Sequence, residues 1–291
     1  MATIYRSKEE YIEVFDELTR QYSQVTSEVI GYSVQGRAIK MYRIGDPRGG
    51  KVLYDGQIHG CSCTASEMLY LYAKWLLQSG DAAAQRILNR NCTLIIPVFN
   101  IDSYGRKNTA GVDLNRNFEY NWQNSGSPDP TSDYYHGPSA LSEPESQAVK
   151  AVFEREKPFF YLNFHTFGGP WIGSFTATAE QRNYCTTVAS LWESLMRKMG
   201  IEIFYPYTEH SLGNGYAVSD AAVLGINSFL NEILVSGATP QVPPLAEFET
   251  VWFPRWLPIA ITLSEECGKD LPQGFPFELA LAGLAILLAI T

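Results

Sequence analysis

The sequence predicts an α/β protein: a single domain with a central mixed, mostly parallel twisted sheet that helices cover on both faces. Apolar segments of strand length alternate along the chain with longer segments of helical periodicity, and this alternation is typical of sheets covered by helices. Pro and Gly residues fall between the segments, where turns are needed. A chain of 291 residues, 45% of them hydrophobic, can bury the core that such a sheet requires.

Six short apolar segments, bounded by turn residues, have the composition of strands. The predicted strands lie at 29–32, 38–44, 51–58, 93–100, 159–164 and 227–234. The first two flank a turn at Gln35-Gly36, and the other four are apolar enough to be buried on both faces.

Five longer segments repeat their apolar residues at helical spacing. The predicted helices lie at 8–22, 64–77, 143–155, 180–199 and 256–266. Thr64 and Glu67 have the spacing of a capping box, which predicts where the second helix begins. Pro258 falls in the first turn of the last helix, where a missing N–H is tolerated.

The domain is expected to cover residues 1–268, and residues 269–291 form a linker followed by an apolar tail. The tail is apolar from Gly274 onward except for Glu278, and its length is at the lower limit for a membrane span. We interpret it as a membrane or sorting segment, with a buried C-terminal helix as the alternative. An anchor would favour an extracytoplasmic protein whose export signal has been removed; a cytoplasmic location is the alternative.

Charge and cysteine content restrict the classes of partner. The net charge is −9 and the basic residues are scattered, so we expect no nucleic-acid partner. The five cysteines include no CxxC pair, which argues against a structural zinc ribbon.

Residues able to carry chemistry fall at the ends of predicted strands, or inside one of them. His59 and His165 each follow an apolar strand, and Glu232 lies within another. Because catalytic sites of α/β sheets lie at strand ends, two histidines and an acid there indicate zinc. A bound zinc would polarise a carbonyl and acidify its water, and Glu232 would accept the proton.

A second cluster lies just past the strand at 93–100. Asn115 and Arg116 are adjacent, and Arg106 lies shortly upstream. A guanidinium presents a planar fork of donors that matches a carboxylate at two points, which a lysine cannot do. The cluster therefore predicts a site for a free carboxylate.

Together these segments resemble the carboxypeptidase A-like zinc metallocarboxypeptidases, from about residue 5 to about residue 268. The matching motifs are Gln57-Ile58-His59-Gly60, Gly105-Arg106-Lys107-Asn108, Val112-Asp113-Leu114-Asn115-Arg116-Asn117-Phe118, Asn163-Phe164-His165-Thr166-Phe167 and the strand at 227–234. The resemblance implies a Zn2+ cofactor held by His59 and His165. It also implies that Asn115 and Arg116 bind the terminal carboxylate of the substrate, that Arg106 and the zinc stabilise the oxyanion, and that Glu232 activates water. Tyr207 corresponds to a substrate-capping tyrosine if a short gap is allowed; Tyr205 and His210 are the alternatives.

One position departs from the family pattern. The first ligand pair of the family is His-x-x-Glu, and here the fourth position is Ser62. A serine is neutral and too short to reproduce two-point binding. Cys61, Cys63 and Glu67 lie nearby in the sequence, and each is a candidate replacement for the missing ligand.

The leading functional prediction is a zinc metallocarboxypeptidase that hydrolyses the C-terminal bond of peptides and proteins through a zinc-activated water, with an activity impaired by Ser62. A zinc-dependent deacylase of N-acyl amino acids is one alternative. A catalytically weak protein that binds peptide C-termini is the other. The position that sets pocket chemistry in the family falls on Ala217, which argues against strong selection of basic side chains, although Asp220 lies close by.

Overall fold

The computed structural model describes residues 5–166, 171–198, 208–210, 212–233 and 242–266. The strands in this part of the chain are β1 (Val25–Tyr32), β2 (Ala38–Gly45), β3 (Gly50–Asp55), β4 (Asn91–Ile96), β5 (Phe160–His165), β6 (Trp171–Phe175), β7 (Thr208–His210) and β8 (Asn227–Glu232). The helices are α1 (Lys8–Gln21), α2 (Cys63–Gln78), α3 (Ala82–Arg90), α4 (Pro144–Glu156), α5 (Ala179–Lys198), α6 (Ala217–Val223), α7 (Leu245–Glu247) and α8 (Phe253–Glu266). The sequence analysis did not predict β6, β7, α3, α6 or α7. All but α3 have seven residues or fewer, which leaves little room for a periodic pattern, whereas α3 has nine.

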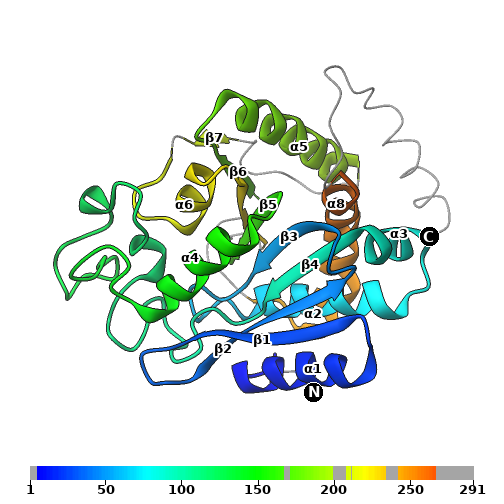
Figure 1. The fold of residues 1–291 in the computed structure, drawn as a ribbon, viewed down its shortest axis with the longest axis horizontal. Coiled ribbons are helices and arrows are strands. Elements are labelled where there is room, and N and C mark those ends of the chain that lie inside the picture. The colour runs from blue at the N-terminus through cyan, green and yellow to red at the C-terminus, as the bar shows by residue number, and fades with distance from the viewer. Residues whose placement is uncertain (1–4, 167–170, 199–207, 211, 234–241, 267–291) are drawn as a thin grey trace.

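These strands form one mixed sheet in the order β1-β2-β4-β3-β5-β8-β6-β7 (Figure 1). The four central strands β4, β3, β5 and β8 are parallel to one another. The pairs β1-β2, β2-β4 and β6-β8 are antiparallel. The predicted fold class is therefore confirmed: an α/β domain with a mixed sheet whose centre is parallel.

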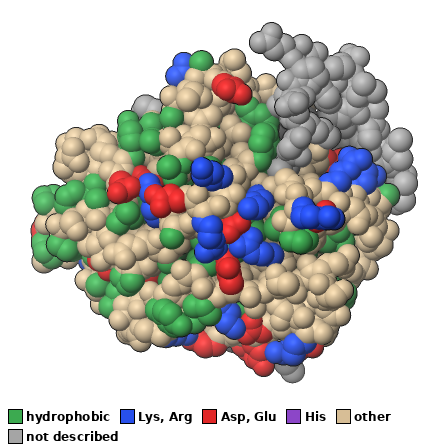
Figure 2. Space-filling model, in the orientation of Figure 1, with side chains coloured by type: hydrophobic (Ala, Val, Ile, Leu, Met, Phe, Trp, Pro, Cys, Tyr) green, Lys and Arg blue, Asp and Glu red, His purple; other side chains and the backbone are tan. Residues whose placement is uncertain are grey.

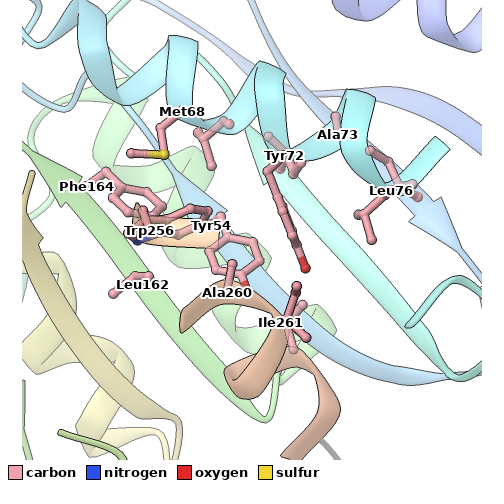
Figure 3. Packing of buried hydrophobic residues seen from close by; sticks show 14 of the residues in the cluster. Tyr54, Met68, Tyr72, Ala73, Leu76, Leu162, Phe164, Trp256, Ala260 and Ile261 are labelled. Carbon is pink, nitrogen blue, oxygen red and sulfur yellow. The ribbon is translucent and has the colours of Figure 1, made fainter. Parts of the chain in front are cut away.

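Each face of the sheet contributes to its own hydrophobic core, because side chains alternate along a strand. Val52 and Tyr54 pack into one core with residues of α2, α3, α5 and α8. Leu53 packs into the other core with residues of α4 and α6. Figure 3 shows the first core, where the labelled aromatic rings and aliphatic side chains of β3, α2, β5 and α8 meet. Helices thus cover both faces, as predicted.

The predicted capping box at Thr64 and Glu67 is wrong. Helix α2 begins at Cys63 with Ser62 as its N-cap residue, so Thr64 already lies in the first turn. Glu67 does not turn back to the helix terminus, because its carboxylate accepts hydrogen bonds from Arg6 at 2.8 and 2.7 Å. The hydroxyl of Tyr11 donates a third at 3.0 Å. A buried carboxylate is stabilised more by a cation than by a cap.

Acidic and basic side chains lie next to one another on the face shown in Figure 2, with apolar ones scattered between them. Among the described residues, no helix combines the length and hydropathy needed to cross a membrane. The apolar tail, the linker before it and the predicted boundary at 268 lie outside the described residues.

Candidate functional site

Three parallel strands deliver the predicted chemistry-bearing residues to one edge of the sheet. His59 follows β3, His165 ends β5 and Glu232 ends β8. His165 and Glu232 are register partners across β5 and β8. The rings of His59 and His165 lie edge to face, with centroids 4.9 Å apart. The structure therefore brings these three residues together from positions far apart in the sequence.

The turn after His59 requires glycine. A Cβ atom added to Gly60 would lie 1.6 Å from the carbonyl oxygen of Ser103, a distance that no side chain can adopt. The turn that carries the first histidine thus packs directly against the segment that leads to Arg106.

Asp113 joins the first histidine to that arginine. Its Oδ1 lies 3.1 Å from Nε2 of His59, and its Oδ2 accepts hydrogen bonds from Arg106 at 2.8 and 2.7 Å. Burial opposes ionisation of Asp113, but the hydrogen bond with His59 and the charge of Arg106 lower its pKa to about 2. Because the ionised carboxylate only accepts, Nε2 of His59 carries the proton and Nδ1 carries the lone pair.

The second histidine is oriented in a similar way. Nε2 of His165 is hydrogen-bonded to Oδ1 of Asn163. The other end of this amide donates to Asp55, which also accepts a hydrogen bond from Tyr161 at 2.6 Å. The amide oxygen can only accept, so Nε2 of His165 is protonated and Nδ1 again carries the lone pair. Burial lowers the pKa of both histidines, so both rings are neutral at neutral pH.

Asn115 and Arg116, the residues predicted to bind a substrate carboxylate, lie on a 3-10 turn (Leu114–Arg116). The side chain of Asp113 caps this turn. Oδ1 of Asn115 accepts a hydrogen bond from the backbone N–H of Ala217 at 3.2 Å, so its Nδ2 group is the end that can bind a ligand. Arg116 is half-buried and donates to the carbonyl of Asn115 at 2.8 Å. No carboxylate pairs with Arg116 in the part of the chain that the structure describes.

The side chain of Asp220 is hydrogen-bonded to donors within the protein. Its carboxylate accepts hydrogen bonds from the backbone N–H groups of Glu119 and Tyr120, at 3.2 and 2.7 Å, and from Lys150 at 3.1 Å. It is 2% exposed. These three donors occupy the carboxylate that could otherwise have attracted a basic substrate side chain.

Comparison with known proteins assigns the family. The family profile described as zinc carboxypeptidase, Peptidase_M14, matches residues 11–219. The chain belongs to the zinc carboxypeptidase family. Carboxypeptidase A6 of Homo sapiens is 29% identical over 56% of this chain and 43% of its own length. Carboxypeptidase B of Helicoverpa zea is 26% identical over 76% of this chain and 58% of its own. This chain therefore spans about half the length of the curated relatives it matches.

Solved carboxypeptidase structures share the fold. Bovine thrombin-activatable fibrinolysis inhibitor, solved in complex with tick carboxypeptidase inhibitor, superposes with a TM-score of 0.80 at 19% identity, covering 92% of this chain and 99% of that one. Carboxypeptidase A from Helicoverpa armigera superposes with a TM-score of 0.73 at 24% identity, covering 88% and 72%.

The family is zinc-dependent, and a catalytic zinc requires a defined set of protein ligands. His59 and His165 each offer an Nδ1 lone pair, whereas a catalytic zinc takes three protein ligands. Within the described residues, no group of three or more His, Cys, Asp or Glu side chains is arranged so that it could hold a metal ion. Ser62 is buried near them: its N–H donates to the carbonyl of His59, and its hydroxyl accepts a hydrogen bond from Thr166 at 3.0 Å.

The three candidate replacement ligands each lie in a different environment. Glu67 is bound to Arg6 and Tyr11. Cys61 is exposed. Burial raises the pKa of the Cys63 thiol, which disfavours the thiolate that binds zinc.

Sequence reasoning missed several residues that shape this carboxypeptidase-like site. Asp113 and Asn163 lie inside the matching motifs, but neither was assigned a role. Their bonds to His59 and Asp55 join residues distant in the sequence, and these bonds are not visible in a local pattern. Tyr205 and Tyr207 lie outside the described residues, and of His210 only the backbone in β7 is described.

Proposed function

We propose that this protein recognises the free C-terminus of peptides and hydrolyses the terminal peptide bond only slowly. The observation that carries the proposal is Arg116, a half-buried guanidinium to which no described carboxylate is paired. Asp113 forms an ion pair with Arg106 nearby, so the site contains one arginine with a carboxylate partner and one, Arg116, whose charge a ligand can balance. A peptide carboxylate would accept from Arg116 and from Nδ2 of Asn115.

Weak hydrolysis is inferred from Ser62, which we place at the position of the glutamate that completes the zinc ligands in the family. Glu232, beside His165 at the end of β8, would act as the general base, and Arg106 would donate to the oxyanion. A protein that binds peptide C-termini without turnover is the second candidate, favoured by the two-histidine donor set.

Two measurements test the proposal. Calorimetry should show that an N-acetylated dipeptide ending in leucine binds, and that the same peptide with a C-terminal amide binds much more weakly. Equal affinity for acid and amide would refute carboxylate recognition. Metal analysis after dialysis against zinc should give well under one zinc per chain; slow but measurable peptide cleavage then separates the weak enzyme from the pure binding protein.

A further inference from the structure

Two tyrosine rings contact the guanidinium of Arg116, the arginine that no described carboxylate pairs with. Cζ of Arg116 lies over the ring of Tyr216, 4.4 Å from its centroid, and over the ring of Tyr134 at 5.5 Å. Cζ of Arg106 lies 4.5 Å from the centroid of the same Tyr134 ring. These distances fall within the range of cation–π attraction. Tyr134 and Tyr216, here called the tyrosine pair, come from different parts of the fold: a loop and the residue before α6.

The backbone fixes the rest of Arg116. Gly126 has a φ of +46°, and a Cβ atom added there would lie 2.2 Å from the carbonyl oxygen of Tyr134 and 3.1 Å from Cγ of Arg116. The hydroxyl of Ser125 donates to the carbonyl of Arg116 at 2.9 Å. The loop that carries Tyr134 is thus packed against the aliphatic stem of Arg116, so the tyrosine pair and the arginine form one unit.

A ring face and a carboxylate affect a guanidinium differently. A neighbouring carboxylate neutralises the cation and competes with any anionic ligand, as Asp113 does at Arg106. A tyrosine ring attracts the cation through its quadrupole but leaves its full charge available. It also excludes water from the space it occupies, which strengthens the attraction between the cation and a bound carboxylate.

We propose that the tyrosine pair determines the specificity of this site for peptides with a free terminal carboxylate, by holding Arg116 in place and keeping its charge uncompensated. This inference rests on the proposed function, and it adds Tyr134 and Tyr216 to the residues that serve carboxylate recognition. Tyr134 and Tyr216 are positioning residues, because they act through Arg116. Tyr134 is 50% exposed, so its replacement removes the ring without opening the core.

The test compares Tyr134→Leu with Tyr134→Phe. Leucine occupies similar space without an aromatic face, whereas phenylalanine keeps the face and loses only the hydroxyl. Tyr32→Leu is the matched control. Tyr32 is 59% exposed and lies on the edge strand β1, which the strands β2, β4, β3 and β5 separate from β8. Affinities of the N-acetylated dipeptide ending in leucine and of its C-terminal amide are measured by calorimetry for each protein.

Tyr134→Leu is expected to bind the acid about tenfold more weakly while its affinity for the amide stays at the wild-type value, so the acid-to-amide ratio falls. Tyr134→Phe should keep most of that ratio, and Tyr32→Leu should keep all of it. An unchanged ratio in Tyr134→Leu, or an equal loss for acid and amide, would overturn the inference and leave the proposed function standing. A wild type that binds acid and amide equally would overturn both. If Tyr134→Leu is poorly folded by its melting temperature, Tyr216→Leu makes the same test with the other ring.

Discussion

Replacing Ser62 by glutamate should convert the two-histidine site into a three-ligand zinc site. Ser62 is 2% exposed, and its hydroxyl accepts from Thr166. The substitution removes that hydrogen bond, a cost of about 1 kcal/mol, and buries a carboxylate beside two neutral imidazoles, a further cost of about 1–3 kcal/mol. Without metal, the free energy of unfolding of Ser62→Glu should therefore be about 2–4 kcal/mol lower than that of the wild type.

Zinc should reverse this loss. Restoring a ligand is expected to raise zinc affinity at least about tenfold, or about 1.4 kcal/mol of binding free energy. At a free zinc concentration of about 100 times the Kd, binding would stabilise the folded protein by about 2.7 kcal/mol. The cleavage rate of a blocked dipeptide should rise by at least about tenfold as well.

Competition with a chromophoric chelator measures the affinity, and urea unfolding with and without zinc measures the stability. Ser62→Gln is the matched control, because it has the size of glutamate without the charge. Tight binding of one zinc per chain by the wild type, which has Ser62, would show that another group completes the set of zinc ligands. Equal zinc affinities of the Glu and Gln variants would show that the carboxylate does not reach the metal, and either result would refute the reasoning.

Three further predictions concern single residues. Arg116→Ala should weaken binding of the free-acid dipeptide by about 1.5–3 kcal/mol with little effect on the amide; a parallel loss for both peptides would contradict the assigned role. Glu232→Gln should lower any cleavage rate by about two to four powers of ten at a peptide affinity within a few-fold of wild type, and near-normal turnover would place the base elsewhere. Burial raises the pKa of Asp55 from 3.8 to about 7. As pH rises, Asp55 therefore loses its proton at a lower pH in the unfolded chain than in the folded protein. The free energy of unfolding should fall between about pH 4 and pH 7, by at most about 4 kcal/mol. Asp55→Asn should flatten that part of the curve, as urea unfolding at pH 4 and pH 8 would show; an unchanged slope would exclude Asp55 as its source.

The fold class and the main core strands followed from the sequence because their signals are local. Apolar runs such as 93–100 and helical spacing such as 8–22 report burial whatever lies across the sheet. Asn115 and Arg116 could be singled out for the same reason, since the residues that define the cluster are contiguous.

The predicted capping box was wrong because the partner of Glu67 is distant in the sequence. Thr64 and Glu67 have the spacing of a capping box, but Arg6, 61 residues before Glu67, binds the carboxylate instead. Nothing in a local pattern shows which cation a buried acid will meet. Strand β7 was missed because three residues have too little periodicity to detect. Helix α3 did carry a local signal, since its buried residues Ala83, Ala84, Ile87 and Leu88 repeat at helical spacing.

The sequence by itself determined which residue types were available: two histidines, an acid and an Asn-Arg pair near strand ends, with Ser62 three residues after the first histidine. Only the tertiary structure decided how they are used. It set Asp113 between His59 and Arg106, left Arg116 without a described carboxylate, and brought the ring of Tyr134 against both guanidinia. The physical reason is that charge pairing and ring contacts depend on distances in space, which sheet topology and loop packing fix and which residue order alone does not contain.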